Sequence, residues 1–168
     1  PDPDKCMAAS DYNAFKGAHE DLRDEIYRMR FYNAKSYGAF GNGSADDTSE
    51  IQDALNAAST AGGGTVYVPE GTYMIASVGS TRDCYSPRQG GISIPANVHL
   101  MLAPGATLKA ITNSSDFYNI VRMDGSNSRL SGGVIQGERA THTGSTGEWG
   151  YGISICGPAN NVTVDNIV

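Results

Sequence analysis

Residues 39–75 read AFGNGSADDTSEIQDALNAASTAGGGTVYVPEGTYMI, and this stretch predicts the fold more clearly than any other part of the chain. Turn residues fill Ala39–Asp47, and Asp47–Glu50 has the pattern of a capping box at the start of a helix. Apolar residues then recur at helical spacing, at Ile51, Ala54, Leu55 and Ala58. We therefore expect a helix that begins at Asp47 or Thr48 and buries one face.

Two β-strands are expected directly after this helix. Gly62–Gly64 ends the helical pattern, Thr65–Val68 alternates as a strand, and Pro69–Gly71 turns the chain into a second strand, Thr72–Ile75. A helix lying across the open end of a stacked β-solenoid shields the unpaired strand edges of the first coil. The stretch therefore predicts the capped beginning of a β-solenoid.

The later sequence repeats at a period typical of solenoids. Three segments share one pattern of apolar and polar residues after an Asn: Ala96–Leu100, Ser126–Leu130 and Asn160–Val164. The aligned residues Asn97, Asn127 and Asn161 are 30 and 34 residues apart. Because Asn tolerates left-handed backbone angles, we expect these side chains to stack as a ladder where one strand bends into the next.

Apolar segments before and after each Asn give three short strands per coil, and about four coils are visible. The main alternative, a β-sandwich, predicts turn signals about every 8 to 12 residues without the longer recurrence.

In this order the elements resemble the N-terminal signature of the pectate-lyase-like right-handed parallel β-helix proteins, which include polysaccharide lyases, glycosidases and bacteriophage tailspikes. The resemblance covers roughly Asn33 to Val168. It implies a mainly β fold, a right-handed parallel β-helix with an N-terminal capping α-helix. Because this fold supports lyases, hydrolases and binding proteins alike, the resemblance says little about chemistry.

A second helical pattern, Ser10–Asn33, precedes the β body. In a heptad register its a and d positions are Tyr12, Phe15, His19, Leu22, Ile26 and Met29. Charges beside this seam have the signs expected for a parallel homo-oligomer, so we predict a short coiled-coil neck. The alternative is one amphipathic helix packed against its own domain. The resemblance to tailspikes implies a homotrimer.

These patterns divide the chain into four parts. Residues 1–9 are expected to form an extended leader, 10–32 the helical neck, 33–76 a leading strand with the capping helix and the first strands, and 77–168 the first coils. The chain starts without Met and stops within a strand pattern at Val168. Both observations predict a fragment of a longer chain whose β-helix is incomplete at its C-terminal side.

Composition and charge exclude several classes of function. Before Ala76 there are 12 acidic and 6 basic residues, so the whole net charge of −6 lies there. Binding to nucleic acid or to anionic membranes requires clustered Lys and Arg, so we expect neither, and no apolar run is long enough for membrane insertion. Cys6, Cys84 and Cys156 indicate neither a disulfide framework nor a zinc site. No nucleotide-binding motif is present, and we predict no cofactor and no metal.

Two insertions, Val78–Gly91 and Gly137–Gly152, are the places where a β-helix would build a groove. The second is richer in acids, cations and aromatic rings. Glycoside hydrolysis needs two carboxyl groups about 5 to 9.5 Å apart. The candidate catalytic residues are Glu138, Glu148 and Asp124, and the candidate substrate-binding residues are Arg139, Trp149 and Tyr151. For each carboxylate, an exposed loop position without catalytic function is the alternative.

The leading hypothesis is a phage tailspike or neck appendage, located in the virion. Its N-terminal part would contact other virion proteins, and the full-length protein would adsorb to host cell-surface polysaccharide or teichoic acid and depolymerise it. A secreted, monomeric, pectinase-like lyase or glycosidase is the second hypothesis. A structural adhesin without catalysis is the third.

Overall fold

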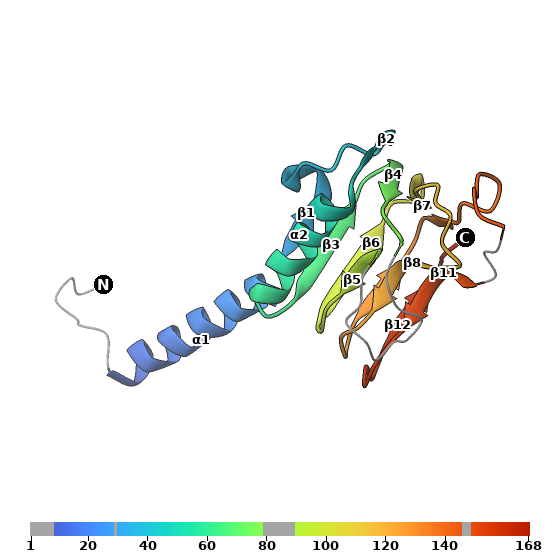
Figure 1. Cartoon of the computed structure of the whole chain (residues 1–168). Coiled ribbons are helices and arrows are strands. Elements are labelled where there is room, and N and C mark those ends of the chain that lie inside the picture. Colours follow the sequence, from blue (N-terminus) through green and yellow to red (C-terminus); the bar gives the residue numbers. More distant parts are fainter. Residues whose placement is uncertain (1–8, 29, 79–89, 146–148) are drawn as a thin grey trace.

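The computed structural model describes residues 9–28, 30–78, 90–145 and 149–168, and its strands stack as a parallel β-helix (Figure 1). All pairings between the named strands are parallel. The prediction of a mainly β, parallel β-helical fold is confirmed.

Three sheets form the sides of the column. The five-stranded sheet has the order β1 (Phe31–Asn33), β3 (Gly64–Val68), β6 (Val98–Leu102), β9 (Arg129–Ser131) and β12 (Thr163–Asp165). The four-stranded sheet has the order β10 (Val134–Gln136), β7 (Ala106–Ala110), β4 (Gly71–Ile75) and β2 (Asn42–Asp46). The three-stranded sheet has the order β11 (Trp149–Ile155), β8 (Phe117–Met123) and β5 (Ile92–Ile94).

The core consists of side chains stacked from coil to coil. In the five-stranded sheet, Val66, Leu100 and Leu130 lie in register and are all fully buried. Tyr73 and Leu108 form the equivalent row of the four-stranded sheet. Each buried side chain of this size contributes about 1.5–3 kcal/mol relative to an exposed one, so each coil stabilises the next.

Helix α2 (Thr48–Thr60) lies at the end of the column beside β1 and β3, opposite the C terminus (Figure 1). Its buried face consists of the predicted residues, Ile51, Ala54, Leu55 and Ala58. Gln52 extends the cap to the edge of the three-stranded sheet, because its side-chain amide donates to the Ser93 carbonyl (3.1 Å) and accepts from the Ser93 N–H (2.8 Å). The Gln52 side chain thus makes the two backbone hydrogen bonds that a neighbouring strand would make.

The predicted capping box at Asp47–Glu50 is not formed. The carboxylate of Asp47 is buried and accepts hydrogen bonds from the backbone N–H groups of Phe40 (2.6 Å) and Gly41 (3.2 Å). The N–H of Thr48 donates instead to Asp46 Oδ1 (3.0 Å). Asp47 is used to hold the preceding turn, since two otherwise unpaired backbone donors there need an acceptor.

The predicted asparagine ladder is confirmed. Asn97, Asn127 and Asn161 all have left-handed backbones, with φ of 60°, 55° and 55°. Asn127 Nδ2 donates to Asn97 Oδ1 (3.2 Å), and Asn161 Nδ2 donates to Asn127 Oδ1 (3.1 Å). Gly63 lies below this row with φ of 131°, and a Cβ there would be 2.6 Å from the Asn97 carbonyl oxygen. The first coil therefore needs glycine at its corner.

The N-terminal helix α1 (Ala9–Arg28) extends away from the column (Figure 1). The predicted helical segment, residues 10–32, is too long at its C-terminal end, because Phe31–Asn33 forms β1 and pairs with β3 in the register Phe31↔Thr65. This pairing gives hydrogen-bond partners to backbone groups at the edge of β3, and a longer helix would leave those groups unpaired. The column therefore begins at Phe31.

The described part of the predicted neck seam is exposed. Tyr12, Phe15 and Leu22 are 58%, 62% and 57% exposed, and His19 lies beside Phe15 with ring centroids 6.3 Å apart. The single-helix alternative requires these side chains to pack against the column, and they do not. Met29 and the side chain of Ile26 lie outside the described residues.

Cys156, which follows β11, is disulfide-bonded. Its partner lies outside the described residues. The odd number and wide spacing of the cysteines indicated no disulfide framework, and the bond at Cys156 corrects that interpretation. In the described ranges, neither α1 nor α2 has the length and apolar character needed to cross a membrane.

Candidate functional site

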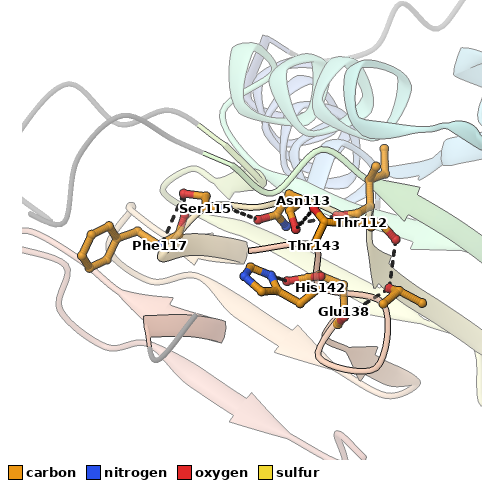
Figure 2. A network of polar contacts seen from close by, with 9 residues as sticks. Thr112, Asn113, Ser115, Phe117, Glu138, His142 and Thr143 are labelled. Atoms are coloured by element: carbon orange, nitrogen blue, oxygen red, sulfur yellow. Dashed lines mark hydrogen bonds and ion pairs between the residues drawn. The ribbon is translucent and has the colours of Figure 1, made fainter. Parts of the chain in front are cut away.

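The predicted insertion after β10 forms a loop that stacks on the loop of the coil below. Its described part runs from 137 to 145, and the lower loop connects β7 to β8 across residues 111–116. Figure 2 shows the polar side chains of the two loops directed toward one another. This cluster contains Glu138, one of the three candidate catalytic carboxylates.

Threonines join the two loops. Thr112 Oγ1 donates to Thr141 Oγ1 (2.9 Å), while both the backbone N–H and the hydroxyl of Thr143 donate to the Asn113 carbonyl, each at 3.0 Å (Figure 2). Within the lower loop, Asn113 Oδ1 accepts from the N–H of Ser115 (2.9 Å). The upper loop is therefore held in a defined shape by the coil beneath it.

A buried acid and an imidazole lie at the centre of this cluster. Glu138 is 2% exposed, and its Oε1 lies 2.7 Å from His142 Nδ1 (Figure 2). An ionised carboxylate only accepts hydrogen bonds, so with Glu138 in that form His142 Nδ1 is the donor. Within the described residues, Glu138 Oε2 and His142 Nε2 are buried and have no hydrogen-bond partner.

The surroundings of His142 are tight. A Cβ at Gly144 would lie 2.6 Å from His142 Nε2 and 2.8 Å from the Ser114 carbonyl oxygen. The ring is thus enclosed between the two loops, and only 13% of its side chain is exposed. The contact between Glu138 and His142 lies within the loop that also carries Arg139 and holds two of its positions together.

Asp124, the second candidate carboxylate, lies elsewhere on its coil. It follows β8, whereas Glu138 follows β10, so the two residues occupy different corners. Asp124 Oδ2 accepts from Ser93 Oγ (2.6 Å) and lies 3.4 Å from Arg122 Nε. These contacts tie two coils together. Glu148 lies outside the described residues, so its role stays a prediction.

The candidate substrate-binding residues follow Glu138 along the same loop and the next strand. Arg139 is exposed, and Tyr151 on β11 is 45% exposed. Trp149 begins β11 and pairs with Phe117 in the parallel register, and its side chain is not described. Their roles in binding stay predictions.

His142 lies in the predicted insertion Gly137–Gly152, and its position four residues after Glu138 was a signal of this pairing that sequence reasoning did not use. The lower loop, with Thr112 and Asn113, was missed entirely. Its polar residues have the composition of an ordinary turn, and only the stacking of coils gives them partners. Across the described ranges, no group of three or more His, Cys, Asp or Glu side chains is arranged to hold a metal ion.

Comparison with known proteins extends this description. The family described as rhamnogalacturonase A/epimerase, pectate lyase-like, matches residues 31–166. The chain is 38% identical over 143 residues to YclG, an uncharacterized protein of Bacillus subtilis strain 168, covering 80% of this chain and 24% of YclG.

Two solved structures are similar in fold and sequence. The A-module of mannuronan C-5 epimerase AlgE6 from Azotobacter vinelandii aligns with a TM-score of 0.63 and 32% identity, covering 81% of this chain and 36% of the module. PfbA, a surface adhesin of Streptococcus pneumoniae, aligns with a TM-score of 0.61 and 27% identity, covering 82% of this chain and 33% of the PfbA chain. The chain therefore spans only about a quarter to a third of these relatives.

Proposed function

Because the chain belongs to the rhamnogalacturonase A/epimerase, pectate-lyase-like family, we propose that it contributes to a protein that binds and modifies an acidic polysaccharide. The supporting observation is the buried pair of Glu138 and His142, which fixes the loop between β10 and β11. A buried polar atom without a hydrogen bond costs about 1–3 kcal/mol, and this pair carries two such atoms within the described residues. These two unpartnered polar atoms support a functional rather than a purely structural role for the pair.

The loop provides chemistry suited to such a polymer. Arg139 is exposed at its start, where a guanidinium can bind a sugar carboxylate or phosphate in a bidentate manner. Tyr151 offers an aromatic face for a sugar ring. Glu138 and Glu148 remain the candidate proton-transfer groups of this loop, whereas Asp124 lies at a different corner. Glu138 with His142 is the pair best placed to hold a proton near this loop.

Two variants test this proposal. With alginate and purified teichoic acid as probes, Arg139→Ala should weaken binding about 10-fold or more, because it removes a charge-assisted contact. Glu138→Gln keeps the size of the side chain and should lower product release more than binding. Lys109→Ala, which removes a partly exposed charge on β7, is the matched control. A protein that neither binds nor shortens nor epimerises these polymers would refute the proposal.

We also propose that α1 joins three chains in a parallel homotrimeric neck, as in a phage tailspike or neck appendage that attaches to other virion proteins and adsorbs to host cell-surface polysaccharide or teichoic acid. The supporting observation is that Tyr12, Phe15 and Leu22 form an exposed apolar face on a helix that leaves the column. Such a short seam would assist trimers that also meet through other parts of the protein.

The mass of the protein in solution tests the neck. The chain should be trimeric, and a version that begins at Arg30 should lose trimers while keeping its β-helix, measured by light scattering and circular dichroism. A monomer in both cases would favour a secreted single-chain enzyme. Polymer binding without product release would favour the third possibility, an adhesin, as PfbA is.

A further inference from the structure

The outer face of the five-stranded sheet has two rows of side chains, of which Tyr67 also packs partly against the core and Ser131 is buried. Strand pairing places them in register, and alternate residues point outward because Val66, Leu100 and Leu130 point inward. The rows are Phe31, Thr65, His99, Arg129 and Thr163, and Asn33, Tyr67, Met101, Ser131 and Asp165. Neighbouring strands lie about 4.8 Å apart, which is close to the length of one sugar ring in an extended chain.

Aromatic rings lie at the α2 end of this face. Phe31 is 60% exposed, and its ring centroid lies 5.6 Å from that of Tyr67 at an interplanar angle of 39°. The exposed ring of Phe31, with the tilted and partly buried ring of Tyr67 beside it, offers an apolar surface on which the C–H groups of a sugar ring can stack.

Paired polar groups lie further along the face. Arg129 Nε and Nη2 donate to the two carboxylate oxygens of Asp165, at 2.8 and 3.1 Å. These hydrogen bonds lower the pKa of Asp165 and raise the pKa of Arg129, so both groups stay ionised and their charges cancel. Burial lowers the pKa of His99, whose Nε2 lies 2.7 Å from Ser131 Oγ, and the ring is neutral at neutral pH. The described face therefore has no net charge.

We propose that this face binds an uncharged saccharide chain lying along the column, with one ring stacked on Phe31 and Tyr67 and with hydroxyl groups bonded to the Arg129–Asp165 pair. The pair presents donors and acceptors together, which matches a hydroxyl group better than it matches an anion. This site lies on a different sheet from the loop of Glu138 and Arg139, and its ligand is neutral where the ligand of that loop is acidic. The two sites are thus separable by experiment.

Affinity electrophoresis of the protein through gels containing a neutral glucan, mannan or galactan tests the proposal, with alginate gels in parallel. At least one neutral polymer should retard the protein, and Phe31→Ala should weaken this retardation about 3- to 10-fold, the range expected for one aromatic stacking contact. Phe40→Ala is the matched control, because Phe40 is 65% exposed but lies outside the two rows. Retardation in alginate should be unchanged in both variants.

Arg129→Gln tests the Arg129–Asp165 pair independently of the Phe31–Tyr67 pair. This variant should also weaken retardation in the neutral gel. Retardation by no neutral polymer, an equal loss in Phe31→Ala and Phe40→Ala, or a change in oligomeric state with Phe31→Ala would each overturn the proposal. Loss of alginate retardation in Arg139→Ala alone concerns the loop and leaves this face unaffected.

Discussion

The helices α1 and α2 have similar amphipathic patterns and opposite surroundings. In α2, Ile51, Ala54, Leu55 and Ala58 are fully buried against the first coil. In α1, the described seam residues Tyr12, Phe15 and Leu22 are more than half exposed. The pattern alone predicts a helix with one apolar face in both cases. What covers that face depends on whether a strand edge of the same chain lies within reach.

Leucine truncation should give the largest contrast between the two helices. Leu55→Ala in α2 should lower the free energy of unfolding by about 2–5 kcal/mol, because it leaves a cavity under the first coil. Leu22→Ala in α1 should change the unfolding of the column by no more than about 0.5 kcal/mol, since the residue is exposed there. Urea denaturation at a protein concentration that gives monomers measures both. Equal destabilisation would show that α1 packs on the column.

The edge contact made by α2 sharpens the comparison. Gln52→Ala should cost about 1–3 kcal/mol, because the N–H and carbonyl of Ser93 lose their partners at the edge of β5. Asp53→Ala, an exposed neighbour on the same helix, is the control and should have little effect. Hydrogen exchange at Ser93 would report the change directly, and unaltered protection in Gln52→Ala would contradict this account.

The asparagine ladder stabilises the column by joining successive coils, whereas the described apolar face of α1 has no such contacts with the column. Asn127→Ala should cost about 1–2 kcal/mol, because it removes two side-chain hydrogen bonds and places alanine at a φ of 55°. Asn127→Gly relieves the backbone strain and keeps only the loss of hydrogen bonds. Thermal unfolding of the two variants separates the contributions, and equal melting temperatures would mean that the left-handed backbone is not costly here.

The smallest expected effect is the dependence of the column on pH. The folded protein holds the pKa of His99 below its ordinary value, so protonation favours the unfolded chain. Stability should therefore fall as the pH drops through about 6.5, the ordinary pKa of histidine. His99→Gln should flatten this decrease between pH 7.5 and pH 5, measured by urea denaturation. A steeper decrease in the variant would show the opposite sign.

The column could be predicted from sequence because local rules and the repeat agree. Asn97, Asn127 and Asn161 mark corners through backbone preference, which is a property of one residue type. The prediction of the apolar face of α2 is confirmed for a similar reason, because it rests on a local pattern of residues. The use of Asp47 was not predictable, since the same Asp at a helix start can cap the helix or hold the turn before it, and only the position of Phe40 and Gly41 decides.

The candidate site was only partly predictable. Glu138 and Arg139 were found because long insertions are unusual in a repeating chain. The contacts that define the loop, from Thr112 and Asn113, come from the coil below and have no signature in sequence. The end of the first helix was also misplaced, because no Gly or Pro ends the helical pattern before Phe31–Asn33, and these residues pair with β3.

The short strand β1 has a mechanical consequence. Only residues 29 and 30 separate α1 from β1, and β1 pairs with β3 at Phe31, Tyr32 and Asn33 alone. A force applied to α1 therefore reaches the column through this small set of hydrogen bonds. We expect β1 to detach first under tension, while α2 and the coils above it stay intact.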